Sequence, residues 1–149
     1  MNNNTIRSAR QVLLVAGLIL ILIAAGCGKE DNHPEIPDVP VSFAIDPNST
    51  EYNEISYIGG WIYLTGGYNG ILVYRPEMTV FVAYDRACPY DFQENNARIV
   101  VEDSGITCVC PVCGSKYIIT DGTPFEGPSR YVLKQYQTTY DGSLLYIYN

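Results

Sequence analysis

The chain has very little histidine and little positive charge. It contains one histidine, His33, and 9 Lys and Arg residues against 16 Asp and Glu, which gives a net charge of −7. A nucleophilic Ser or Cys needs a neighbouring base, usually histidine, so nucleophilic catalysis is disfavoured. Nucleic acids and anionic lipids bind clustered Lys and Arg, so the acidic balance disfavours both as partners. No phosphate loop or dinucleotide fingerprint occurs, and we expect that the protein is not an enzyme.

Residues 1–26 have the composition of a bacterial export signal. Arg7 and Arg10 precede an almost unbroken apolar run over 12–25, which ends in small residues before Cys27. The run is shorter than the ~20 residues of a comfortable transmembrane helix, although an uncleaved signal anchor is the alternative. The ending resembles a lipobox, with Ala24 in place of the usual Leu. We therefore expect cleavage after residue 26 and lipidation of Cys27.

The sequence of residues 27–40 predicts a lipidated N-terminus and a proline-rich tether. The acyl chains on Cys27 would hold the protein on a membrane, and Pro34, Pro37 and Pro40 would keep the tether semi-extended. The run Gly28-Lys29-Glu30-Asp31 resembles the signal that sends some Bacteroidetes-type lipoproteins to the cell surface. These features predict a location in the cell envelope, at the outer membrane, with surface exposure as a hypothesis. The sequence names no protein partner.

Residues 41–149 predict one small all-β domain, an antiparallel sandwich or barrel. Val, Ile, Thr and Tyr dominate its apolar runs, and glycine pairs such as Asn69-Gly70 supply the positive φ of hairpin turns. No amphipathic pattern of helical period is present. The expected strands are 41–45, 52–57, 60–65, 70–75, 79–84, 97–102, 106–110, 115–119, 131–136 and 143–148.

Four of the five cysteines lie in this domain, at positions 88, 108, 110 and 113. Cys88 follows the predicted strand 79–84, and Cys110 is the last residue of the predicted strand 106–110. Each precedes a proline, which ends a ladder and begins a loop. The Cys110-Pro111-Val112-Cys113 run brings two thiols close enough to share a metal or to form a disulfide. On an extended strand, Cys108 points to the same side as Cys110. We expect the two Cys-Pro loops to face each other at the tip of a small sheet.

These motifs together resemble a Rieske domain, over nearly the whole of 41–149. Asp85-Arg86-Ala87-Cys88-Pro89-Tyr90 is similar to the first cluster-binding loop, and Cys110-Pro111-Val112-Cys113-Gly114-Ser115 to the second. Asp121-Gly122-Thr123 and Gly127-Pro128-Ser129 are similar to the segments that follow. The resemblance implies a Rieske-type fold, a 2Fe–2S cluster and electron transfer. It also implies that Gly114, Ser115, Gly127 and Pro128 support the loops around the centre.

The ligand positions depart from the Rieske pattern. A Rieske centre is held by two thiolates on one iron and two imidazoles on the other. Cys88 and Cys110 occupy the cysteine positions, whereas Tyr90 and Cys113 stand where the histidines would be. His33 lies in the tether and cannot replace both imidazoles. An ordinary histidine-ligated cluster therefore cannot form.

Three hypotheses remain for the cysteine site. In an oxidising compartment the thiols would form disulfides, Cys88–Cys110 or Cys88–Cys113, and Cys108 allows a second bond. The domain would then lack a cluster and have a binding or structural role. We favour this disulfide hypothesis, because an exported protein lies in a compartment where disulfides persist. In the second hypothesis, Cys88, Cys110 and Cys113 bind zinc or iron, with Cys108 or Tyr90 as fourth ligand. In the third, an altered 2Fe–2S cluster is held mainly by cysteine, with the Tyr90 oxygen as a further ligand.

Overall fold

The computed structural model describes residues 35–94 and 96–149. The predicted signal peptide, the lipidation site Cys27 and His33 lie outside the described residues. Within the described part no helix has the length and the apolar content that crossing a bilayer requires. The elements are β1 (Ser42–Ile45), η1 (Thr50–Ile55), β2 (Trp61–Leu64), β3 (Ile71–Glu77), β4 (Val80–Asp85), β5 (Val100–Val101), β6 (Thr107–Val109), β7 (Lys116–Ile118), β8 (Pro124–Glu126), β9 (Gln135–Tyr140) and β10 (Leu145–Tyr148).

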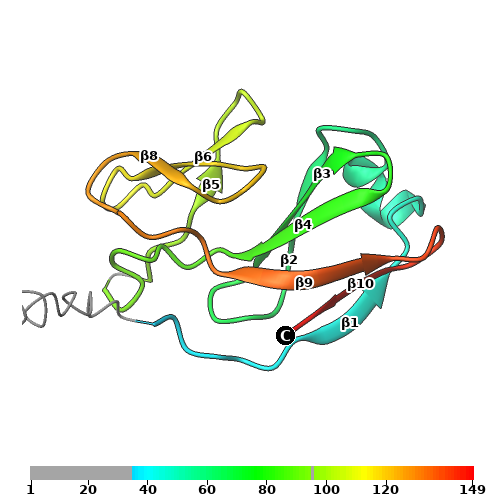
Figure 1. The fold of residues 1–149 in the computed structure, drawn as a ribbon, viewed down its shortest axis with the longest axis horizontal. Coiled ribbons are helices and arrows are strands. Elements are labelled where there is room, and N and C mark those ends of the chain that lie inside the picture. The colour runs from blue at the N-terminus through cyan, green and yellow to red at the C-terminus, as the bar shows by residue number, and fades with distance from the viewer. Residues whose placement is uncertain (1–34, 95) are drawn as a thin grey trace, which may run out of the picture. The chain divides into compact units, whose positions relative to one another are not determined.

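The strands form two antiparallel sheets (Figure 1). The larger sheet has six strands in the order β1-β10-β9-β4-β3-β2, and the smaller has four in the order β5-β6-β7-β8. All pairings between neighbouring strands are antiparallel. The smaller sheet is inserted in the chain between β4 and β9, which are themselves neighbours in the larger sheet. The structure confirms the predicted all-β, antiparallel class.

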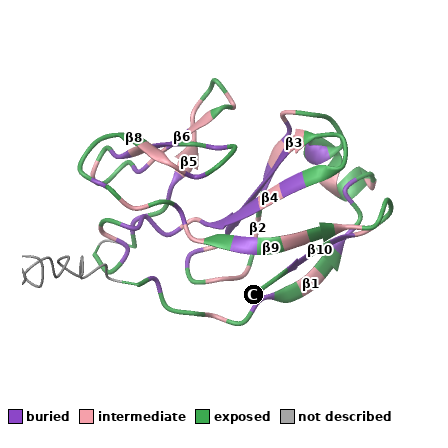
Figure 2. Ribbon diagram, in the orientation of Figure 1, coloured by how far each residue is buried: buried purple, intermediate pink, exposed green. Residues whose placement is uncertain are grey.

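Strands β3 and β4 are buried on both faces because their alternating side chains enter two different core clusters. Ile71 and Val73 of β3 belong to the first cluster, and Leu72 and Tyr74 to the second. In β4, Ala83 likewise faces the first cluster and Tyr84 the second. A period of two places successive side chains on opposite sides of a sheet, so one strand can serve two cores. The buried stretches run along these strands in Figure 2.

The second cluster joins the two sheets. It combines Leu72 and Tyr84 of the larger sheet with Cys108 and Tyr117 of the smaller one, and all four side chains are fully buried. The strands of the smaller sheet have only two or three residues each. Such short ladders contribute few hydrogen bonds, so the smaller sheet depends on this shared core and on its loops.

The predicted strand over 52–57 is wrong. Residues Thr50–Ile55 form a 3₁₀ helix that ends with the Ser56 N–H donating to the Asn53 carbonyl. Tyr52 and Ile55 are three residues apart, which is one turn of such a helix, and both pack against the first cluster. Ile55 and Tyr57 also alternate with polar residues, as they would in a strand, so packing decides between the two structures.

Two further differences concern the return from the smaller sheet. The strand predicted over 131–136 is Gln135–Tyr140, because residues 131–134 still cross between the sheets. β8 (Pro124–Glu126) was not predicted, since a proline at the first residue suggests a turn. A proline is tolerated there because β8 is an edge strand.

Candidate metal centre

The first loop of the site follows β4 and is fixed by the buried carboxylate of Asp85. Asp85 Oδ1 accepts the N–H of Ala87 at 2.8 Å, which sets the chain direction immediately before Cys88. The Cys88 N–H donates to Ala97 O at 3.0 Å, and the Asp91 N–H donates to Cys88 O at 3.3 Å. This turn places the side chains of Cys88 and Asp91 close together.

The second loop connects β6 to β7. The Cys110 N–H donates to Ser115 O, and the Gly114 N–H donates back to Cys110 O, both at 2.8 Å. Gly114 has φ of +76°, a conformation that glycine adopts at little cost. The turn thereby holds Cys110 and Cys113 on one small loop.

The two loops converge on one group of four potential ligands, Cys88, Asp91, Cys110 and Cys113. Their ligating atoms all lie within 4.8 Å of one another. Cys88 Sγ is 3.6 Å from Cys113 Sγ, and Cys110 Sγ is 3.6 Å from Asp91 Oδ1. A tetrahedral ion with metal–sulfur bonds of about 2.3 Å separates its sulfur ligands by about 3.8 Å. The spacing therefore suits one tetrahedral ion.

Burial shapes the chemistry of the thiols. Cys88 and Cys110 are fully buried, and Cys113 is half-buried. Burial raises the pKa of the Cys88 thiol and of the Cys110 thiol, because a thiolate is poorly solvated there. A bound cation reverses this preference, since coordinated thiols are deprotonated.

Two hydroxyl groups contact the sulfur atoms. Tyr117 Oη lies 3.5 Å from Cys88 Sγ, and the Cys113 thiol donates to Ser115 Oγ at 3.1 Å. Ser115 Oγ also accepts the Ser129 N–H at 3.0 Å, so Ser115 links the second loop to the segment after β8. Hydrogen bonds of this kind orient ligands and adjust the properties of a bound metal.

The predicted site residues are only partly brought together. Cys88, Cys110 and Cys113 join the group, whereas Cys108 lies outside it and Tyr90 is half exposed. Cys108 is a buried core thiol, and burial raises its pKa to about 12.

The predicted supporting residues lie around the second loop. Gly114 and Ser115 form its turn, and Gly127 packs directly against the Ser115 backbone. Pro128 is exposed beside them. The segment around Gly127 therefore packs against the loop that carries Cys110 and Cys113 and supports it.

Asp91 was not among the predicted ligands. The signal is present, because Cys88-Pro89-Tyr90-Asp91 and Cys110-Pro111-Val112-Cys113 share the pattern Cys-Pro-x-ligand. In both runs the second donor follows the first by three residues. Each loop therefore supplies two donors to the group, and in the first loop the second donor is a carboxylate.

The four described cysteines are free thiols. The separation of 3.6 Å between Cys88 Sγ and Cys113 Sγ is well beyond the bond length of about 2.05 Å. The expected disulfide is thus not found among residues 35–94 and 96–149.

A Rieske-type cluster does not fit this donor set. Residues 35–149 contain no histidine, so both imidazole ligands are missing from the described part. In a two-iron cluster, ligands of different irons are also separated by the Fe₂S₂ core and lie farther apart than two ligands of one iron. The compact group of four donors fits a single ion better.

Comparisons with known proteins give similarity in fold alone. No family model and no curated protein matches the chain. The ferredoxin of carbazole 1,9a-dioxygenase from Nocardioides aromaticivorans IC177 is similar with a TM-score of 0.47 and 14% identity, over 74% of this chain and 97% of that chain. A complex of reduced oxygenase and oxidized ferredoxin in carbazole 1,9a-dioxygenase gives a TM-score of 0.48 and 15% identity, over 75% and 94%. At these values the similarity assigns no role to any residue.

Proposed function

We propose that this chain is an envelope-anchored lipoprotein whose β domain binds one metal ion through Cys88, Asp91, Cys110 and Cys113. The observation that carries the proposal is the convergence of four ligating atoms from two loops within 4.8 Å. Three thiolates and one carboxylate around a tetrahedron suit zinc or iron. Mg²⁺ and Ca²⁺ prefer oxygen ligands and more of them, which disfavours both.

The proposed centre is structural rather than catalytic. Four protein ligands fill a tetrahedron and leave no position for water or substrate. The ion would tie the loop after β4 to the loop between β6 and β7, and thereby order the short strands of the smaller sheet. The domain would then act in recognition at the envelope, without enzymatic activity of its own.

The test is the composition of the full-length chain, purified in detergent without chelators. We expect about one equivalent of zinc or iron, free thiols after metal removal, and no inorganic sulfide. Asp91→Asn should lower metal affinity by about 10-fold or more, because a neutral amide oxygen is a weaker ligand. Cys108→Ala is the matched control and should leave the stoichiometry unchanged. Metal-free protein without free thiols would contradict the proposal and support disulfide formation.

An electron carrier with an altered 2Fe–2S cluster is the second candidate. It is favoured by the hydroxyl of Tyr117 beside Cys88 Sγ, since hydrogen bonds to sulfur help to set cluster potentials. The same purification separates the two candidates. Iron with inorganic sulfide and a reddish colour would replace the single-ion proposal with this one.

A further inference from the structure

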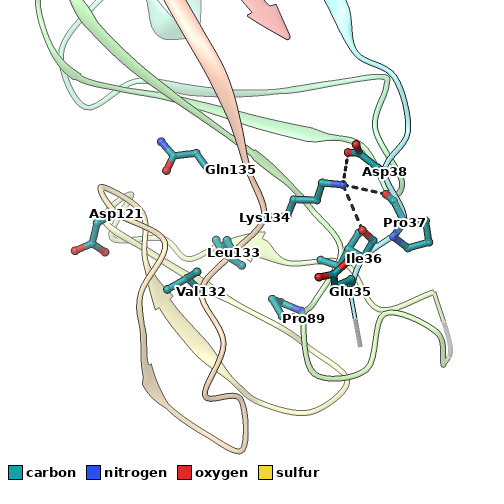
Figure 3. A pocket seen from close by; sticks show the side chains of 10 residues that line it. All are labelled: Glu35, Ile36, Pro37, Asp38, Pro89, Asp121, Val132, Leu133, Lys134 and Gln135. Atoms are coloured by element: carbon teal, nitrogen blue, oxygen red, sulfur yellow. Dashed lines mark hydrogen bonds and ion pairs between the residues drawn. The ribbon is translucent and has the colours of Figure 1, made fainter. Parts of the chain in front are cut away.

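The segment 35–41, which we call the strap, precedes β1 and is held by hydrogen bonds along its length. Lys134 Nζ donates to Ile36 O at 3.3 Å and to Pro37 O at 3.0 Å, and pairs with Asp38 Oδ1 at 2.9 Å (Figure 3). Three contacts from one ammonium group form a latch at the N-terminal end of the strap.

The C-terminal residue Asn149 fastens the other half of the strap. Its Nδ2 donates to Asp38 Oδ1 at 2.9 Å and to Val39 O at 3.0 Å. Its Oδ1 accepts the Val41 N–H at 2.8 Å. With Pro37 and Pro40 the strap also has few alternative conformations to lose, which lowers the entropic cost of holding it in place.

Ile36 connects the strap to the proposed metal centre. Its side chain is 8% exposed and packs with Ala87 and Phe92 in a small cluster apart from the two main cores. Ala87 and Phe92 are the sequence neighbours of Cys88 and Asp91, the two ligands on the first loop.

Other contacts to Ala87 and Phe92 come from the larger sheet and the loop before β3. Phe92 meets the Tyr68 ring edge-on at 5.6 Å, and the backbone of Ala87 bonds to Asp85. Among the described residues, Ile36 is the one member of the small cluster that comes from outside the loop. Removing it would leave the apolar side of the loop open.

We propose that the strap holds the first ligand loop in its metal-binding position, with Ile36 as the positioning residue and Lys134 as the latch. The inference rests on the proposed metal-binding function. It predicts that loosening the strap speeds metal release without removing any ligand. Groups outside the ligand set that orient ligands commonly change metal affinity by about 10- to 100-fold.

The first test measures zinc release from the full-length protein to an excess of a coloured chelator, 4-(2-pyridylazo)resorcinol. Ile36→Ala should release zinc about 10-fold faster than wild type. Ile45→Ala is the matched control, because Ile45 is 6% exposed but lies in the first core cluster, away from the ligands. Lys134→Gln keeps the apolar contact of Ile36 and should also speed zinc release. It replaces Ile36→Ala in the test if that variant fails to fold. Equal rates for Ile36→Ala and Ile45→Ala would overturn the proposal.

The second test works on metal-free protein and separates this inference from the proposed function. Mass spectrometry follows alkylation of Cys88 and, as an internal reference, of Cys108 in β6. Ile36→Ala should expose Cys88 and raise its alkylation rate relative to Cys108, whereas Ile45→Ala should not. If wild type binds no zinc, the proposed metal-binding function fails. Faster alkylation of Cys88 in Ile36→Ala would still support the proposed role of the strap in holding the loop. An unchanged ratio of Cys88 to Cys108 alkylation overturns the strap whatever the metal content.

Discussion

Asp85 is the residue on which both the larger sheet and the ligand loop depend. Its fully buried carboxylate accepts four hydrogen bonds, from the N–H groups of Tyr68, Asn69 and Ala87 and from the Tyr136 hydroxyl. A charge is tolerated in the interior when hydrogen bonds replace its hydration shell. Gly67 is required beside it, since a Cβ there would lie 2.6 Å from Asp85 Oδ2.

Asp85→Ala should therefore destabilise the domain strongly. Four donors lose their acceptor in the interior, and a cost of about 3 kcal/mol or more is expected. Urea denaturation followed by circular dichroism measures it. Asp141→Ala is the control, because Asp141 also accepts two backbone N–H groups but is exposed in a turn. A loss no larger than that of the control would contradict the role assigned to Asp85.

Two buried tyrosines, Tyr84 and Tyr136, should make the free energy of unfolding depend on pH in the alkaline range. Burial raises the pKa of Tyr84, with the Asp121 charge adding to it, and burial raises the pKa of Tyr136 beside Asp85. Unfolded tyrosine ionises near pH 10. Above that pH the unfolded chain releases protons that the folded protein retains, so stability falls as pH rises.

Tyr84→Phe should weaken this alkaline loss. The Tyr84 hydroxyl is buried without a hydrogen-bond partner among the described residues, so its removal should also gain about 1 kcal/mol at neutral pH. Tyr136→Phe should instead destabilise, since it takes a donor from Asp85. Urea midpoints at pH ~8 and ~10.5 compare the three proteins. Equal alkaline losses in wild type and Tyr84→Phe would rule out this origin.

Among the elements, the turn after β8 supports the second ligand loop by close approach. A Cβ at Gly127 would lie 2.5 Å from Ser115 Cα and 3.0 Å from Gly114 O, and Gly127 has φ of +93°. The turn and the loop can pack this closely only because position 127 has no side chain.

Gly127→Ala should destabilise the smaller sheet and weaken metal binding, because backbone rather than a flexible side chain must move. We expect about 2 kcal/mol or more. Gly105→Ala is the control, since Gly105 has a similar φ of +71° but open space around its Cα, and strain of about 1 kcal/mol is expected there. Thermal unfolding and metal content give the comparison. Equal effects at both glycines would argue against the close packing at Gly127.

For the whole molecule, we propose that a lipid anchor on Cys27 decides where the domain works. Cys27→Ala should move the protein from the membrane fraction to the soluble fraction, since the acyl chains would be lost. Immunoblots of both fractions after a high-salt wash measure this, and Cys108→Ala is the control. A Cys27→Ala protein that stays in the membrane would favour an uncleaved signal anchor.

The sequence by itself determined most of the strands, because strand periodicity is a local property. Alternating residues such as Ile71, Leu72 and Val73 specify two faces, and glycine pairs specify turns. The two Cys-Pro runs likewise located the candidate site, since proline ends a ladder locally. The 3₁₀ helix at Thr50–Ile55 was not predicted, because Ile55 and Tyr57 alternate with polar residues as they would in a strand.

Only the tertiary structure decided which donors meet. Cys108 and Cys110 share one side of a strand in the sequence pattern and both are buried in the second cluster, yet only Cys110 joins the group of potential ligands. Asp91 reaches the thiols because the turn after Cys88 folds back toward the second loop. A ligand set depends on where separate loops come together in space, and neither composition nor spacing contains that information.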